Sequence, residues 1–143
     1  MHQASDQPAE IASLSPADSR PRLVVWYNTR CPVCNGGIDW QRNKLIAAVR
    51  DGRVAFEDIN DEPDALAAYG ASLDDVRRRL HATDEAGGLI VGADVAIATW
   101  RITPGEGWLA TLFGNRLLLP LARFAYDRFA DLLFAWNRWK GRW

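Results

Sequence analysis

The chain has 143 residues, of which 48% are hydrophobic and 24% are charged. This length and composition allow one domain with a buried core and exclude a disordered chain. The formal net charge of −1 provides no basic field for nucleic acid, and charged residues interrupt the most apolar region, which argues against a transmembrane segment. The first residues do not resemble a secretory signal, so we expect a cytoplasmic protein whose thiols are kept reduced.

The first predicted strand follows a segment without periodicity. Residues 1–21 are rich in Ala, Ser, Pro and Asp, which predicts a flexible N-terminal tail. We expect residues 22–143 to form a single domain. Residues 23–27, LVVWY, are a continuous apolar run that is typical of a central strand buried on both faces.

A helix and a second strand are predicted after this run. In NGGIDWQRNKLIAAVRDGR, residues 35–53, apolar residues recur near helical spacing and Asp51-Gly52 supplies an end signal. Residues 53–59, RVAFEDI, alternate in polarity and end before turn-prone residues. The order strand, helix, strand predicts a parallel pair with a right-handed crossover.

The next elements complete an α/β core. A short helix closed by Gly70 is followed by a helix from Ser72, with Asp75 placed for a capping box. Two short apolar pieces around DEAGG predict a hairpin, and residues 93–103 predict a helix ended by Pro and Gly. The order β-α-β-α-β-β matches the minimal layout of a thioredoxin-like fold.

A helical extension is expected over about residues 106–143. One face of the predicted helix is expected to pack on the domain, and Arg123, Asp127 and Asp131 lie on the opposite face. The packing face consists of Leu118, Leu121, Ala125, Phe129, Leu132, Trp136 and Trp139. The extension carries surplus apolar residues and ends in WNRWKGRW. A partner helix, a homodimer and peripheral contact with an anionic membrane surface are therefore alternative uses. The oligomeric state stays open.

Both cysteines lie in YNTRCPVCNGG, between the first strand and the first helix. The free backbone N–H groups of a first helical turn stabilise a thiolate, so Cys31 is predicted to face solvent as the nucleophile, with Cys34 behind it as the resolving thiol. Pro32 suits the first helical position. Arg30 adds a positive charge beside Cys31, and Asn28 can accept a backbone hydrogen bond in the turn.

Metal binding and chance burial are the alternatives for this pair. A zinc site needs a second pair of ligands, and only His2 and His81 remain; an iron–sulfur cluster normally takes four cysteines. Two inert buried cysteines are a further alternative, because free cysteine is often buried. We therefore predict no cofactor and no metal.

The sequence resembles the DCC family of thiol–disulfide oxidoreductases, which is named for a D-x-x-C-x-x-C motif after the first strand. The resemblance rests on NTRCPVC, VAFEDI, RLHATDEAGGLIVGADVA and the Trp-bearing helix that follows. It implies a thioredoxin-like fold with Cys31 and Cys34 as the redox pair. Asn28 stands at the family's aspartate position, and this difference would weaken the activity if that aspartate relays protons.

A second departure concerns the thioredoxin fold in general, in which a cis-proline usually precedes the third strand. This sequence has no proline at the equivalent place, near residues 78–80. The leading hypothesis is a thiol–disulfide oxidoreductase that acts on an unknown protein or small-molecule substrate. The alternative is a non-catalytic binding or redox-sensing module that uses the C-terminal helix as its interaction surface.

Overall fold

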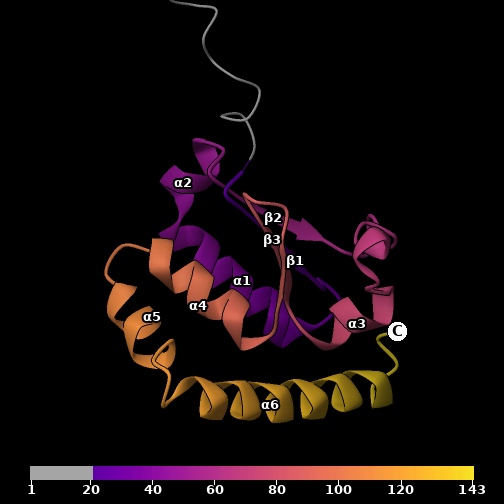
Figure 1. The fold of residues 1–143 in the computed structure, drawn as a ribbon. Coiled ribbons are helices and arrows are strands. Elements are labelled where there is room, and N and C mark those ends of the chain that lie inside the picture. Colours follow the sequence, from indigo (N-terminus) through magenta and orange to yellow (C-terminus); the bar gives the residue numbers. More distant parts are fainter. Residues whose placement is uncertain (1–20) are drawn as a thin grey trace, which may run out of the picture.

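The computed structural model describes residues 21–143, so the tail expected at residues 1–21 lies outside the described residues except for residue 21. Strands and helices alternate along the chain before a helical C-terminal region (Figure 1). In chain order the elements are β1 (Leu23–Tyr27), α1 (Pro32–Lys44), α2 (Ile46–Arg50), β2 (Val54–Asp58), the 3-10 turn η2 (Ala67–Tyr69), α3 (Leu73–Arg78), β3 (His81–Asp84), β4 (Leu89–Val91), α4 (Ala93–Ile102), α5 (Gly107–Phe113) and α6 (Leu119–Trp139).

The strands form one mixed sheet in the order β2-β1-β3-β4. β1 runs parallel to β2, with Leu23 opposite Val54, and antiparallel to β3, with Trp26 opposite His81. β3 and β4 form the expected antiparallel hairpin. The sheet confirms the predicted crossover unit, the central position of β1 and a thioredoxin-like α/β fold.

Helices cover both faces of the sheet, with α1 and α4 on one side and α3 on the other (Figure 1). On the first side Val25 and Tyr27 of β1 pack with Ile38 of α1 and Val95 of α4. On the second side half-buried Trp26 packs against a separate apolar cluster that includes Val76 of α3. The alternation of β1 side chains between two covered faces explains its continuous apolar sequence.

The predicted helix begins at Pro32, as expected, but it is interrupted before its predicted end at Asp51-Gly52. Leu45 has φ −109° and ψ 19°, outside the helical region, and separates α1 from α2. Its side chain is buried with Ala48 and Val54 in a small apolar cluster. Burial of Leu45 against the start of β2 therefore accounts for the interruption, which the sequence spacing did not reveal.

The connection before α3 follows the prediction closely. Gly70 closes η2 with a positive φ of 79°, a conformation that glycine adopts without strain. Ser72 caps α3 in a capping box: its hydroxyl accepts from the Asp75 N–H at 3.2 Å, and the Asp75 carboxylate accepts from the Ser72 N–H at 2.8 Å. This cap fixes the start of α3, whose end leads directly into β3.

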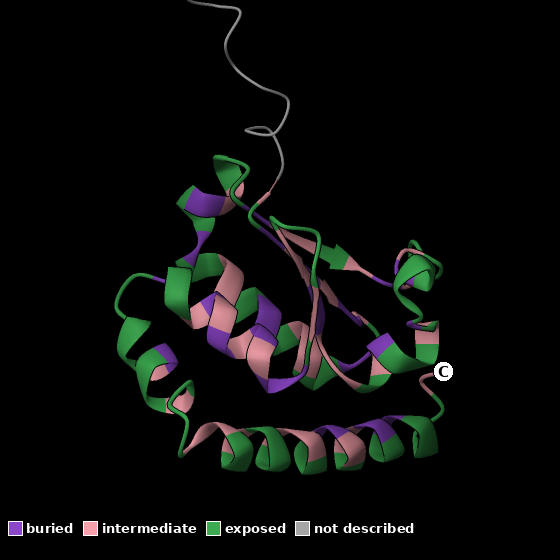
Figure 2. Cartoon of the chain, viewed as in Figure 1, coloured by how far each residue is buried: buried purple, intermediate pink, exposed green. Residues whose placement is uncertain are grey.

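α6 runs along the ends of both layers, beside α3 and α4, but the predicted packing face was wrong (Figure 1). Leu121, Leu132 and Trp139 are exposed, whereas Ala130 and Phe134 are buried against the domain (Figure 2). Asp127 and Asp131, which were predicted to lie on the side away from the domain, form ion pairs with Arg79 of the domain. None of the described helices is both long enough and apolar enough to cross a bilayer.

Candidate active site

The two thiols lie in the first turn of α1. Cys31 is the N-cap residue and Pro32 the first helical residue, as predicted. The Cys31 N–H donates to the Asn28 carbonyl at 3.2 Å, and the Cys34 N–H donates to Cys31 Sγ at 3.2 Å. The turn after β1 therefore positions the Cys34 N–H, which has no partner within the helix, to donate to the Cys31 sulfur.

A second donor reaches this sulfur from α6. Asn137 Nδ2 donates to Cys31 Sγ at 3.2 Å, and Asn137 is fully buried. Arg142 holds the amide in place, because its Nη1 donates to Asn137 Oδ1 at 2.7 Å. With Asn137 in this position only 1% of the Cys31 surface is exposed.

The hydrogen bonds separate the two thiols in acidity. The pKa of Cys31 falls from 9.0 to about 6, chiefly because the Cys34 thiol donates a hydrogen bond to the Cys31 thiolate. Burial acts in the opposite direction, and the hydrogen bonds from the Cys34 N–H and Asn137 lower the pKa further. The same hydrogen bond, burial and the adjacent negative charge raise the pKa of Cys34. At neutral pH the site therefore holds one thiolate, Cys31, and one thiol, Cys34.

The expected exposure of the two sulfurs was wrong. Cys31 is buried, whereas Cys34 is half-buried and lines a cavity of about 290 Å³. The prediction considered only α1, where the first residue of the turn faces outward. α6 covers that position and leaves the sulfur one turn further along the helix at the edge of the cavity.

The cavity lies between α1, α4, α6 and the segment that joins α3 to β3. Its lining is largely apolar and includes Ile38, Trp100, Phe129 and Leu133. Cys34 is the sulfur among the lining residues. A small apolar group that enters the cavity would therefore meet Cys34 before Cys31.

Asn28 occupies the turn between β1 and α1 and is 2% exposed. Its Oδ1 accepts from the Arg30 N–H at 3.1 Å, which confirms the predicted turn hydrogen bond, and from Asn60 Nδ2 at 2.7 Å. Its Nδ2 is buried without a partner, although Asn28 also lines the cavity. The Arg30 side chain is exposed, and its effect on the Cys31 thiolate stays a prediction.

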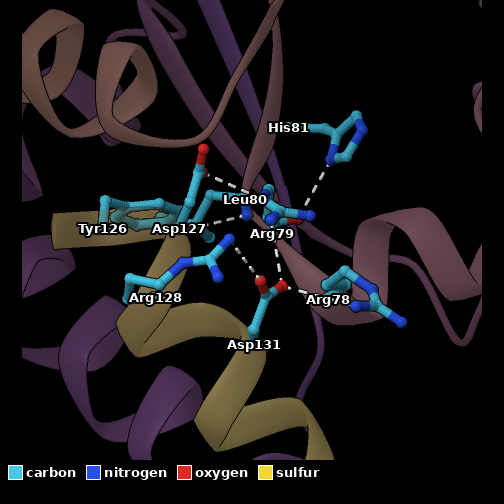
Figure 3. Close-up of polar contacts among 8 residues, drawn as sticks. All are labelled: Arg78, Arg79, Leu80, His81, Tyr126, Asp127, Arg128 and Asp131. Carbon is cyan, nitrogen blue, oxygen red and sulfur yellow. Dashed lines mark hydrogen bonds and ion pairs between the residues drawn. The ribbon is translucent and has the colours of Figure 1, made fainter. Parts of the chain in front are cut away.

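Ion pairs and one hydrogen bond fasten α6 to the segment before β3 (Figure 3). Arg79 Nε donates to Asp127 Oδ1 and its Nη2 to Asp131 Oδ1, both at 2.9 Å. The Leu80 N–H donates to the Tyr126 hydroxyl at 2.9 Å, and His81 Nδ1 lies 2.9 Å from the Arg79 carbonyl oxygen. We call the contacts of Arg79 and Leu80 with α6 the latch.

The latch involves residues 79 and 80, in the segment where we expect the counterpart of the cis-proline that thioredoxins usually carry. Residues 77–80 border the cavity, and no cis peptide bond occurs among residues 21–143. His81 is buried in β3, and burial lowers its pKa, which keeps the ring neutral. In this protein the segment before β3 is therefore set by α6.

Asn137, Tyr126 and Asn60 are the site residues that the sequence analysis missed. A signal for Asn137 existed, since it is an uncharged polar residue in an apolar helix on the side of Ala130, four positions beyond Leu133. The wrong choice of packing face concealed it. Residues 21–143 bring together no group of three or more His, Cys, Asp or Glu side chains that could hold a metal ion.

Comparison with known proteins gives one match. The family model described as DCC1-like thiol-disulfide oxidoreductase matches residues 25–139, which include most of β1, the dithiol and all of α6. No curated protein and no solved structure matches the chain significantly. The matched range extends as far as Asn137, so the family model covers both segments that contact the Cys31 sulfur.

Proposed function

The chain belongs to the DCC1-like thiol-disulfide oxidoreductase family, and on this premise we propose that it catalyses thiol–disulfide exchange with Cys31 and Cys34. The observation that supports this most directly is the opposite change in acidity of the two thiols. A nucleophilic thiolate beside a protonated partner thiol is what the two steps of exchange require. The family match supports a redox role for the chain. The step that each cysteine performs is what we propose.

In the reducing direction the Cys31 thiolate attacks one sulfur of a substrate disulfide. The substrate S–S bond breaks, a mixed disulfide forms with Cys31, and the other substrate sulfur leaves as a thiolate. Cys34 then loses its proton to that thiolate and attacks the Cys31 sulfur, which releases the second substrate thiol. Two electrons pass to the substrate, and the protein is left with a Cys31–Cys34 disulfide.

The burial of Cys31 adds a condition to this cycle. A substrate disulfide must approach the Cys31 sulfur in line, and Asn137 occupies that space. The end of α6 therefore has to withdraw before the first attack. Withdrawal removes one hydrogen bond to the thiolate and leaves those from Cys34 in place.

The position of Cys34 favours a second candidate, exchange in the oxidising direction. In the disulfide form, a substrate thiolate in the cavity would attack the Cys34 sulfur, and Cys31 would leave as the thiolate. A thiol of low pKa leaves faster, so the acidity of Cys31 assists this direction. The mostly apolar lining suits a small apolar thiol or an apolar side chain beside a protein cysteine.

Trapping of mixed disulfides tests both assignments. The reduced Cys34→Ser variant should accumulate a mixed disulfide at Cys31 when it meets a small chromogenic disulfide, and Cys31→Ser should lose multiple turnover. Acid quenching of oxidised wild-type protein with an apolar thiol, followed by peptide mass spectrometry, reports whether Cys34 is attacked. Undiminished exchange by Cys31→Ser would contradict the mechanism. Absence of turnover in the wild type would favour the binding module.

A further inference from the structure

The outward side of α6 is exposed (Figure 2), and it carries several large apolar side chains. These side chains lie three, four, seven or eight residues apart on α6 and in the turn just before it, and each of them is more than half exposed. We call them the outer stripe: Leu117, Leu121, Phe124, Leu132 and Trp139. Scattered single apolar residues are common on protein surfaces, but a contiguous row along one helix marks an interaction surface.

The charges around the outer stripe are unevenly arranged. Residues 116–143 carry six cations, Arg116, Arg123, Arg128, Arg138, Lys140 and Arg142. The two acids of this segment, Asp127 and Asp131, form ion pairs with Arg79 of the domain. Arg123 pairs with Asp94 and Arg128 with Asp131, whereas Arg116, Arg138 and Lys140 form no ion pair within residues 21–143. The outward side therefore combines apolar side chains with positive charge, which complements an anionic apolar surface.

Arg128 argues against a second copy of the chain as the occupant. It lies in the outer stripe midway between Leu117 and Trp139, with its guanidinium 5.6 Å from the centre of the Phe124 ring. A symmetric dimer through this stripe would place Arg128 against its own copy at the twofold axis. Each Arg128 is paired with its own Asp131 at 3.3 Å, so the contact would bury two ion pairs at its apolar centre, and their desolvation disfavours association.

We propose that the outer stripe of α6 binds the surface of an anionic lipid bilayer. The apolar side chains would enter the boundary between headgroups and acyl chains, as those of an amphipathic helix lying in the membrane plane do. Arg128 has a long aliphatic stem that allows its guanidinium to reach lipid phosphates. Trp139 suits the interface, and Arg116, Arg138 and Lys140 add attraction to anionic headgroups.

Vesicle flotation of the full chain tests this proposal without thiol chemistry, so its outcome does not depend on the proposed function. Wild-type protein should float with vesicles of phosphatidylcholine and phosphatidylserine, bind phosphatidylcholine vesicles more weakly, and lose binding as salt is added. Leu121→Glu and Leu132→Glu should each weaken binding by about tenfold or more. Ile46→Glu is the matched control, because Ile46 on α2 is 60% exposed and Leu121 is 63% exposed.

A pair of charge variants separates electrostatic attraction from apolar burial. Replacing Arg116 and Lys140 by Gln should weaken binding to anionic vesicles roughly fivefold per charge, whereas replacing Arg22 and Arg50 by Gln should leave it unchanged. Equal binding to neutral and anionic vesicles would overturn the proposal. It would also be overturned if wild-type protein bound neither kind of vesicle and instead formed a dimer that Leu121→Glu dissociates. Light scattering measures the dimer.

Discussion

Two segments of the molecule meet at the Cys31 sulfur, and they differ in how they reach it. The first turn of α1 supplies the Cys34 N–H at 3.2 Å from three residues along the chain. The end of α6 supplies Asn137 Nδ2 at the same distance from 106 residues along the chain. Both groups donate to the Cys31 sulfur, but only Asn137 also shields this sulfur from solvent. The comparison shows that acidity of the thiolate is mainly a local property, whereas access to it is a tertiary one.

The two segments also differ in how firmly they are held. The turn before α1 continues β1, which is paired on both sides within the sheet. α6 is held by a few buried side chains and by ion pairs with partly exposed side chains, which typically contribute up to about 1 kcal/mol each. Local opening begins where stability is lowest, so the end of α6 should open before the turn does. We therefore expect changes in the first turn of α1 to shift the pKa of Cys31 more than changes in α6 do.

Removal of the local thiol should have the largest effect. In Cys34→Ala the pKa of Cys31 should rise from about 6 toward its ordinary value of 9.0, because its main hydrogen-bond donor is lost. Thiolate absorbance as a function of pH measures this, and alkylation at neutral pH should slow by about tenfold or more. Cys34→Ser keeps a donor and should give a smaller rise. An unchanged titration in Cys34→Ala would show that acidity is not local.

A carboxylate introduced at Asn28 should have the next largest effect. Asn28→Asp places a negative charge in the buried turn before Cys31, which raises the pKa of that thiol. The carboxylate can also accept the Cys34 proton, so release of the mixed disulfide should accelerate severalfold. Stopped-flow exchange and the absorbance titration separate the two results. Asn43→Asp, on the exposed side of α1, is the matched control and should change neither.

Loss of the long-range donor should raise the pKa of Cys31 less but expose it more. In Asn137→Ala the pKa should rise only slightly, because Asn137 contributes less than Cys34 does. Well above that pKa, alkylation of Cys31 should be faster by on the order of tenfold because the cover is removed. The free energy of unfolding should fall by about 1–3 kcal/mol. Asn43→Ala serves as the control, and unchanged alkylation would contradict the covering role of α6.

Weakening of the latch should leave the pKa of Cys31 unchanged and alter only access. Asp131→Asn removes the charge that pairs with Arg78, Arg79 and Arg128, at a cost of about 1 kcal/mol or less. Alkylation of Cys31 should accelerate severalfold and lose part of its dependence on salt. Asp39→Asn removes an exposed pair with Arg42 on α1 and is the control. Equal alkylation rates in Asp131→Asn and Asp39→Asn would show that the latch does not control access to Cys31.

Much of the fold could be predicted from the sequence because its signals are local. The apolar run of β1, the capping box at Ser72 and the glycine at position 70 each act through neighbouring residues, and the structure confirms all three. The interruption at Leu45 escaped prediction, since it depends on burial against Val54 of another element. The prediction of the α6 face failed for a related reason. Periodicity distinguishes the two sides of a helix, but it does not show which side will pack on the domain.

The dithiol, its place at the start of α1 and the turn that directs a backbone N–H to Cys31 all follow from local sequence. These features depend on residues 28–34, whose conformation follows from a strand end, a proline and a first helical turn. Which sulfur is exposed depends on how α6 packs on the domain. Asn137 covers Cys31 because buried Ala130 and Phe134, together with the ion pairs between Arg79 and two aspartates of α6, set the rotation of this helix. The same rotation places the outer stripe in solvent.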